Sequence, residues 1–279
     1  MKILIIGNGY LGKRCHAAWP DSVVAEKRIH TVEDVLELLD QHQPDAVLNA
    51  AGVVGKPNVD WCETHQLETI QGNTILPLLI AEACQKRGVY LLHMGTGCVY
   101  YGYAKDRKGW KENDPANPLA VYTRCKYAAD LALSILPNIG IARIRMPIDH
   151  VPAASNLINK LASYSEVVNV VNSVTVVDDM VEVFHQLMEK HAEGIFHVTN
   201  PGAIKHKKIL ALYKKIVDPT HTNKWISAKE MVLQGLVKKT RSNNILQSEN
   251  LEKLGITMRS AKEAVEDTMR KYAEHKKKF

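Results

Sequence analysis

Short apolar runs alternate with longer amphipathic stretches through the first half of the chain. The runs lie at residues 1–6, 22–25, 45–48, 89–92 and 139–145, and each has the length of a strand that is buried on both faces of a sheet. Helices are expected between them. This rhythm predicts an α/β fold, a Rossmann-type doubly wound parallel sheet with right-handed crossovers.

Turn-forming and capping residues mark the ends of the predicted helices. Thr31 is expected to cap a helix that ends near His42. A long helix over 66–86 is expected to be interrupted near Pro77, and the polar segment 101–120 predicts a surface loop. Ligands of such a sheet are expected at the carboxyl ends of its strands.

The first predicted strand runs into a glycine-rich turn. Gly7, Gly9 and Gly12 form the pattern G-x-G-x-x-G between a strand and a helix, which is the context that a dinucleotide site requires. Glycines allow close approach of the backbone to a pyrophosphate, and the helix N-terminus supplies N–H donors. The turn, with Tyr10 and Leu11, therefore predicts an NAD(P) site.

Charged residues after the second predicted strand bear on which nucleotide is bound. Glu26 would bind a ribose 2′-hydroxyl and so favours NAD, whereas Lys27 and Arg28 would accommodate a 2′-phosphate and favour NADP. The residues alone leave NADPH and NADH open.

Small and hydroxyl residues follow the next two strands. Asn49, Ala50, Ala51 and Gly52 end the third strand, where small side chains let a cofactor lie against the sheet. Thr96 follows the fourth strand, where its hydroxyl can hold a carbonyl oxygen. Both segments are expected at the sheet edge that carries the glycine turn.

A tyrosine and a lysine lie one helical turn apart in the segment 121–136. Tyr122 and Lys126 have the spacing that places two side chains on one helix face. Lys126 is expected to lower the pKa of the Tyr122 phenol. Tyr122 would then be the proton donor to a carbonyl oxygen that becomes an alcohol, with Thr96 on the same oxygen.

Composition narrows the class of protein. The chain has 279 residues, 46% of them hydrophobic and 24% charged, which is typical of a soluble globular protein. The net charge of +6 includes basic clusters at 205–208, 238–239 and 276–278, without the interleaved aromatic residues that stack bases. These clusters predict solvated surfaces, and no nucleic-acid partner is expected.

The cysteines and the N-terminus bear on compartment. The five cysteines are scattered without a C-x-x-C pair, which predicts free thiols in a reducing compartment and no zinc site; they are Cys15, Cys62, Cys84, Cys98 and Cys125. His93, His150 and His197 lack metal-ligand spacing, so they are interpreted as structural or surface residues. The N-terminus enters a strand without a signal peptide, and no apolar run reaches the ~18 residues that span a bilayer. We expect a cytoplasmic protein without a membrane partner or a metal.

The pattern loosens after Pro147, which suggests a second part of the molecule. We predict an NAD(P)-binding Rossmann domain over residues 1–149 and a mostly substrate-binding part over 150–279. Strands within about 167–200 are expected to return to the first domain.

The motifs together resemble the extended short-chain dehydrogenase/reductases. Residues 49–63 are similar to a stretch of the bifunctional UDP-4-keto-6-deoxyglucose 3,5-epimerase/4-reductases, which make UDP-L-rhamnose. The dTDP-4-dehydrorhamnose reductases are wider relatives. Further matches to the bifunctional enzymes lie at 96–98, 143–147, 199–202 and 241–244.

The resemblance implies a role for each matching residue. Tyr122 would be the reductase acid, Lys126 its activator and a ligand of the nicotinamide ribose, and Thr96 the third member of the triad. Cys98 matches the epimerase cysteine and Lys160 the proposed epimerase lysine.

The resemblance also implies ligand contacts and an assembly. Arg28 favours NADPH, and Arg241 lies where relatives hold the phosphates of the nucleotide-sugar. Asn58 and Asn243 are further predicted substrate contacts. A homodimer through two long helices, one of them carrying Tyr122, is expected by resemblance only.

The implied chemistry is coherent. A ketone at carbon 4 of a sugar acidifies the protons on carbons 3 and 5, so an acid/base pair such as Cys98 and Lys160 could epimerise those carbons while Thr96 and Tyr122 hold the enolate oxygen. The resulting hypothesis is an NAD(P)H-dependent 3,5-epimerase/4-reductase of a nucleotide-linked 4-keto-6-deoxy sugar, with UDP-L-rhamnose as the favoured product. Two alternatives remain: a reductase only, and a non-catalytic NADP-binding regulatory subunit.

Overall fold

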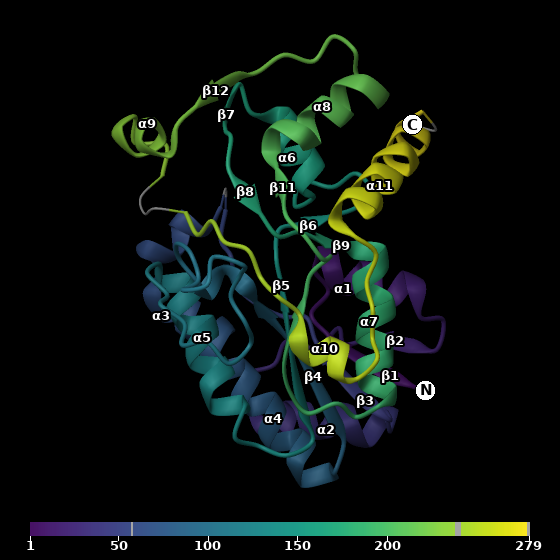
Figure 1. Cartoon of the computed structure of the whole chain (residues 1–279). Helices are drawn as coiled ribbons and strands as arrows, with labels where there is room; N and C mark the ends of the chain where they lie inside the picture. The colour runs from purple at the N-terminus through teal and green to yellow at the C-terminus, as the bar shows by residue number, and fades with distance from the viewer. Residues whose placement is uncertain (57, 238–240, 278–279) are drawn as a thin grey trace. The chain divides into compact units, whose positions relative to one another are not determined.

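The computed structural model describes residues 1–56, 58–237 and 241–277, and the chain forms two compact units (Figure 1). Unit 1 consists of Met1–Val99, Ala116–Arg143 and Val181–Phe196. Unit 2 consists of Tyr100–Pro115, Ile144–Met180 and the described residues from His197 onward. Each unit is therefore assembled from three separate segments.

Unit 1 contains a six-stranded parallel sheet in the order β10-β5-β4-β3-β1-β2. Every residue of β1, β3, β4 and β5 is buried, as expected for strands with both faces covered. The predicted α/β fold is confirmed. The strand bounds are β1 Ile3–Ile6, β2 Ser22–Val24, β3 Ala46–Asn49, β4 Tyr90–Thr96, β5 Ile139–Ile144 and β10 Gly194–Val198.

Helices cover this sheet. The helix α4 packs against both α2 and α5, and Trp19 at the end of α1 meets His185 of α7 with ring centroids 6.2 Å apart. Thr31 caps α2 through a capping box with Asp34, as the sequence predicted. The bounds are α1 Tyr10–Ala18, α2 Val32–His42, α3 Gln66–Ile70, α4 Leu76–Arg87, α5 Val121–Leu133 and α7 Val177–Glu189.

The interruption of the long helix lies before Pro77 rather than at it. A π-helical turn, η2 (Gln71–Ile75), joins α3 to α4, and Pro77, which has no backbone N–H to donate, lies in the first turn of α4. Asn73 in this turn bonds both the N–H and the carbonyl of Val53, at 3.2 and 2.8 Å. The irregular turn thus anchors the loop that follows β3.

Unit 2 is built from short paired strands and helices. The strand pairs are β11 with β8, β12 with β7 and β6 with β9. The strand bounds are β6 Pro147–Ile148, β7 Glu166–Val168, β8 Val171–Asn172, β9 Thr175–Val176, β11 Ile204–Lys205 and β12 Lys224–Ile226. The helix bounds are α6 Leu157–Ser163, α8 His206–Ile216, α9 Ala228–Leu233, α10 Glu249–Lys253 and α11 Ala261–Lys276.

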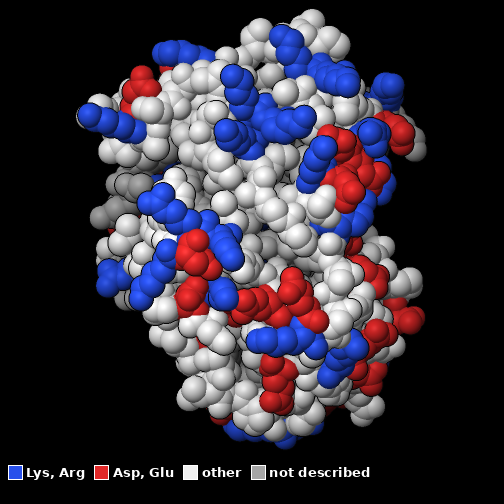
Figure 2. Space-filling model, viewed as in Figure 1, with Lys and Arg blue, Asp and Glu red and all other residues white. Residues whose placement is uncertain are grey.

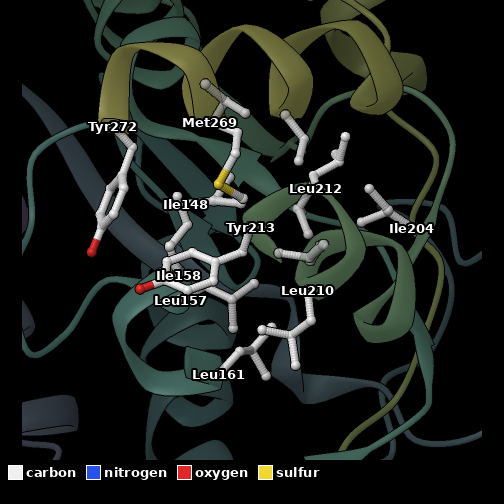
Figure 3. Packing of buried hydrophobic residues seen from close by; sticks show 14 of the residues in the cluster. Ile148, Leu157, Ile158, Leu161, Ile204, Leu210, Leu212, Tyr213, Met269 and Tyr272 are labelled. Carbon is white, nitrogen blue, oxygen red and sulfur yellow. The ribbon is translucent and has the colours of Figure 1, made fainter. Parts of the chain in front are cut away.

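The core of unit 2 lies between α6, α8 and α11. Figure 3 shows side chains from these three helices converging, among them Ile158 of α6, Tyr213 of α8 and Met269 of α11. Ile158 and Met269 are fully buried and Tyr213 is 5% exposed. This apolar cluster gives unit 2 a core of its own.

Charged side chains of both signs are interspersed on the face drawn in Figure 2. Many form ion pairs, such as Arg259 with Asp179 at 2.6 Å. In the basic cluster at 205–208 the three lysines are exposed, whereas the cluster at 238–239 and the last lysine of 276–278 lie outside the described residues. None of the helices in the described ranges has the length and apolar character needed to cross a bilayer.

Candidate active site

The glycine turn after β1 is packed backbone against backbone. Gly7 has φ +116°, and a Cβ placed there would lie 2.4 Å from the Ala51 nitrogen. A Cβ at Gly12 would lie 2.0 Å from the Gly7 carbonyl oxygen. Both positions therefore require glycine, and the turn is held directly against the residues that follow β3.

The same turn leaves open space in front of α1. A Cβ placed at Gly9 would meet nothing within 4 Å, and no side chain caps the helix. Tyr10 and Leu11 form its first turn and are half-buried. Uncapped N–H donors beside open space at a helix N-terminus suit the pyrophosphate of a dinucleotide.

The charged residues after β2 differ in what they contact. Lys27 is engaged by two acidic residues of α2, Asp34 at 2.8 Å and Glu37 at 2.5 Å. Glu26 and Arg28 are exposed, and within the described ranges no hydrogen bond or ion pair holds the Arg28 guanidinium. Arg28 is thus the cation of this group that is available to a ligand.

A buried polar group lies where β3 and β4 end. Asn49 and His93 are register partners in the sheet, and Asn49 Nδ2 lies 3.0 Å from His93 Nδ1. Asn49 Oδ1 accepts the N–H of Ala51 at 3.0 Å. This bond fixes the turn Ala50–Gly52 that follows β3.

Lys126 projects from α5 into the same group. It is 4% exposed, and its Nζ donates to the Met94 carbonyl at 2.8 Å and lies 3.4 Å from His93 Nε2. Burial lowers the pKa of Lys126 to about 8, against an opposing attraction from Asp130. Asp130 is itself paired with Arg143 at 2.7 Å in a fully buried site.

Tyr122 and Thr96 meet at the end of β4. Their side chains share a hydrogen bond, and Thr96 Oγ1 also accepts the N–H of Cys98 at 3.2 Å. Burial raises the pKa of Tyr122, with smaller contributions from Cys98 and Cys62. The expectation that Lys126 lowers the pKa of Tyr122 is therefore wrong, because the phenol is desolvated and the lysine is itself buried and bonded to Met94.

The raised pKa suits a proton donor in reduction. A phenol can give a proton to a developing alkoxide only if it still carries that proton. Because its pKa is raised, Tyr122 holds its proton at neutral pH, and its phenol interacts with the Thr96 hydroxyl. The pair therefore presents two hydroxyls to one carbonyl oxygen.

Two further predicted residues of unit 1 lie in short turns. Cys98 is half-buried in the 3-10 turn η3 (Gly97–Val99) and is close enough to Tyr122 to affect its pKa. Asn58 caps the 3-10 turn η1 (Val59–Glu63) by accepting the N–H of Asp60 at 2.8 Å. The structure thus brings Cys98 to the Thr96–Tyr122 pair, while the Asn58 oxygen serves the local turn.

The remaining predicted residues belong to unit 2. Lys160, in α6, is an exposed residue, and desolvation lowers its pKa. Arg241 and Asn243 are half-buried, and Asn243 Oδ1 accepts from Asn172 Nδ2 at 3.1 Å. Cys98 and Lys160 thus lie in different units, and their roles stay predictions.

Sequence reasoning missed one residue of this group. His93 was interpreted as structural or surface, yet it is fully buried and contacts both Asn49 and Lys126. The available signal was a histidine inside an otherwise apolar strand, three residues before Thr96.

One cluster in unit 2 has metal-ligand spacing. Among the described residues, ligand atoms of Asp149, His150 and Asp178 lie within 4.8 Å of one another. Lys271 Nζ is 3.6 Å from Asp178, so the cluster belongs to a network of ion pairs.

The sheet order, the glycine turn and the Thr96–Tyr122–Lys126 group define the class of the protein: it is an extended short-chain dehydrogenase/reductase, an oxidoreductase of the kind that uses NAD(P)H. Within this class, the chain belongs to the family described as the RmlD substrate binding domain, whose model matches residues 1–274. The resemblance inferred from the sequence motifs is confirmed.

Relatives of the chain include plant and viral proteins. It is 32% identical to the bifunctional dTDP-4-dehydrorhamnose 3,5-epimerase/dTDP-4-dehydrorhamnose reductase of Arabidopsis thaliana, over 92% of this chain and 87% of that protein. It is 31% identical to an Arabidopsis trifunctional UDP-glucose 4,6-dehydratase/UDP-4-keto-6-deoxy-D-glucose 3,5-epimerase/UDP-4-keto-L-rhamnose-reductase, and spans 41% of that protein. The crystal structure of a UDP-rhamnose synthase from Acanthamoeba polyphaga mimivirus is similar, with a TM-score of 0.90 and 29% identity over 97% of this chain and 99% of that one.

Proposed function

We propose that the protein reduces the carbon 4 ketone of a nucleotide-linked 4-keto-6-deoxy sugar with NADPH. The observation that carries this proposal is the interacting Thr96–Tyr122 pair at the end of β4, with the buried Lys126 one helical turn along from Tyr122. The pair lies at the same edge of the sheet as the glycine turn. Two hydroxyls and a neighbouring cation form a site for a carbonyl oxygen that gains negative charge.

The glycine turn and Arg28 would hold the nucleotide cofactor. The open space at Gly9 and the uncapped start of α1 fit a pyrophosphate, and exposed Arg28 fits the 2′-phosphate that distinguishes NADPH from NADH. When bound, the nicotinamide supplies a hydride to carbon 4. Lys126 would bind the nicotinamide ribose, as the resemblance implies.

Tyr122 completes the reduction. The ketone oxygen is oriented by the Thr96 and Tyr122 hydroxyls, and the Tyr122 O–H bond breaks as the product O–H bond forms. Because the pKa of Tyr122 is raised, the phenol is protonated before the reaction begins. Lys126, while protonated, stabilises the phenolate that is left.

We extend the proposal to epimerisation at carbons 3 and 5, with Cys98 and Lys160 as the acid/base pair. Support comes from the relatives: both Arabidopsis proteins named above combine an epimerase with a reductase. The lowered pKa of Lys160 favours a lysine that exchanges protons. UDP is the favoured nucleotide, with Arg241 at its phosphates and Asn58 and Asn243 as further contacts.

One incubation tests the reaction. The protein is mixed with UDP- or dTDP-4-keto-6-deoxyglucose and NADPH or NADH in deuterium oxide, and the product sugar is analysed by NMR. We expect NADPH oxidation and a product reduced at carbon 4 that carries deuterium at carbons 3 and 5. Tight NADPH binding without turnover of either substrate would instead favour a regulatory subunit.

A cysteine variant tests whether Cys98 takes part in the epimerisation. Cys98→Ala should abolish deuterium uptake at carbons 3 and 5, whereas Cys84→Ala, at a buried cysteine of α4, should not. Undiminished uptake in Cys98→Ala would remove Cys98 from the epimerisation step.

A further inference from the structure

Buried polar groups of unit 1 form a line of contacts from Asn49 through His93 to Lys126, which lies one helical turn from Tyr122. Asn49 Oδ1 accepts from Ala51 at 3.0 Å, and Asn49 Nδ2 lies 3.0 Å from His93 Nδ1. His93 Nε2 lies 3.4 Å from Lys126 Nζ, which donates to the Met94 carbonyl at 2.8 Å. Asn49 and His93 are both 0% exposed, so they depend on these partners for their hydrogen bonds.

The backbone end of this line fixes the direction of its hydrogen bonds. The Ala51 N–H can only donate, so the Asn49 oxygen faces it and the Asn49 amide nitrogen faces His93. An amide nitrogen only donates, so His93 Nδ1 must accept and carries no hydrogen. A neutral imidazole then keeps its hydrogen on Nε2, which faces Lys126.

Lys126 is therefore met by a donor. An ammonium has three hydrogens and no lone pair, so a protonated Lys126 cannot accept from the His93 Nε2–H. With the ammonium, one donor faces another somewhere between Ala51 and Lys126, whichever way Asn49 and His93 are turned. A neutral amine accepts from His93 and still donates to Met94, so every group is matched.

We propose that Asn49 and His93 are positioning residues that stabilise the neutral amine of Lys126, and so allow this lysine to release a proton during the reaction. The inference deepens the proposed function and rests on it for its catalytic consequence. The hydrogen-bond directions themselves depend only on the contacts within unit 1.

Two influences on the protonation of Lys126 act in opposite directions, the nearby carboxylate of Asp130 and burial. Asp130, one turn further along α5, favours the ammonium, but its carboxylate is shared with Arg143 of β5. Burial favours the amine and is the larger influence, since the pKa of Lys126 falls to about 8. The loop after β3 contributes uncharged Gly52, whose Cβ position lies 4.0 Å from Lys126 Nζ. His93 on β4 does not compete for the proton, because burial and Lys126 hold its own pKa well below the usual range.

The consequence concerns how Tyr122 is restored. After the Tyr122 O–H bond has broken to form the product hydroxyl, a Lys126 N–H bond can break to supply a proton to the phenolate. The resulting amine accepts the His93 Nε2–H and later regains a proton from water. A lysine held as an ammonium by its surroundings would give up this proton less readily.

The first test reads the tautomer directly. The full-length protein, without nucleotide, is labelled with ¹⁵N-histidine, and the His93 signals are assigned by their loss in His93→Asn. We expect a protonated Nε2 and an unprotonated Nδ1. A protonated Nδ1 with an unprotonated Nε2 would overturn the proposal, and this measurement on the unsubstituted protein needs no variant to remain functional.

The second test measures the pKa of Lys126 by ¹³C-lysine NMR, with the signal assigned through Lys126→Met. His93→Asn can still accept from Asn49 but removes the donor that faces Lys126, so the pKa of Lys126 should rise by about one unit, the worth of roughly one hydrogen bond. His191→Asn, at a histidine whose φ of +46° suits asparagine, is the matched control and should leave that pKa unchanged. An unchanged or lowered pKa of Lys126 in His93→Asn overturns the proposal.

The two NMR tests are independent of the proposed function. If both NMR results hold but no nucleotide-sugar is reduced, the proposed function fails while the hydrogen-bond assignment stands.

Discussion

The two units of the molecule bury their polar side chains for different ends. In unit 1, Lys126 is buried with a lowered pKa beside the Thr96–Tyr122 pair. In unit 2, Arg145 is buried with Nη2 donating to Asn172 Oδ1 and to the Ser242 carbonyl, both at 2.5 Å. The first arrangement costs stability, and we propose that it holds a group that takes part in the reaction. The second uses a charge to fix the backbone of the segment that carries the predicted substrate residues.

The largest effect that sharpens this contrast is expected at Tyr122. Tyr122→Phe removes the proposed proton donor and should lower turnover roughly 10²- to 10⁴-fold, the usual contribution of general acid catalysis. NADPH affinity and thermal stability should change little. Tyr127→Phe, on the same helix, is the control and should keep its turnover. Turnover within a few-fold of the original in Tyr122→Phe would mean that another group donates the proton.

The ionisation of Lys126 should lower the free energy of unfolding of the protein. Its pKa is lowered from 10.5 to about 8, so above pH 8 the unfolded chain binds more protons at this residue than the folded protein does. Stability therefore rises with pH between these two values, and burying the ammonium below pH 8 costs roughly 3 kcal/mol.

Lys126→Met should accordingly raise the free energy of unfolding at neutral pH while it abolishes efficient turnover. The gain over the unsubstituted protein should shrink as the pH rises through the window between about 8 and 10.5. Denaturant unfolding of both proteins at neutral and alkaline pH measures this difference. A gain that does not depend on pH would contradict the buried, titrating lysine.

Arg145 should behave in the opposite way. Arg145→Met leaves the oxygens of Asn172 and Ser242 without their charged donor, so the free energy of unfolding should fall by roughly 1.5–3 kcal/mol. The Michaelis constant for the nucleotide-sugar should rise more than turnover falls, because the chemistry is assigned to unit 1.

The control for Arg145 is Lys224→Met, which removes an exposed ion pair with Glu166 in the same unit. It should change the free energy of unfolding by at most about 1 kcal/mol. Equal losses in the free energy of unfolding for the two substitutions would show that the buried hydrogen bonds of Arg145 stabilise the protein no more than an exposed ion pair does.

The sequence predicted the features that depend on neighbouring residues better than those that depend on long-range contacts. The sheet of unit 1 was predictable because apolar runs such as 1–6 and 89–92 are contiguous and have the length of strands. The glycine turn was predictable because its three glycines lie close together in the sequence. Such patterns are predictable because the residues that form them are neighbours in the sequence.

Long-range contacts were not predictable. Arg145 meets residues 27 and 97 positions away, and no local spacing connects them. The spacing of Tyr122 and Lys126 predicted a shared helix face but not the desolvation of the phenol, which decides the direction in which the pKa of Tyr122 moves. His93 contacts Lys126 across 33 positions, which the apolar strand around it did not reveal.

The central claim is that Tyr122 donates a proton to a ketone beside a bound nicotinamide. The most direct measurement is a single turnover with UDP-4-keto-6-deoxyglucose and NADPH that carries deuterium in the transferable position of the nicotinamide ring. The account predicts deuterium at carbon 4 of the sugar with the unsubstituted protein and almost none with Tyr122→Phe in the same time. Label absent from carbon 4 despite NADPH oxidation, or equal transfer by Tyr122→Phe, would contradict it.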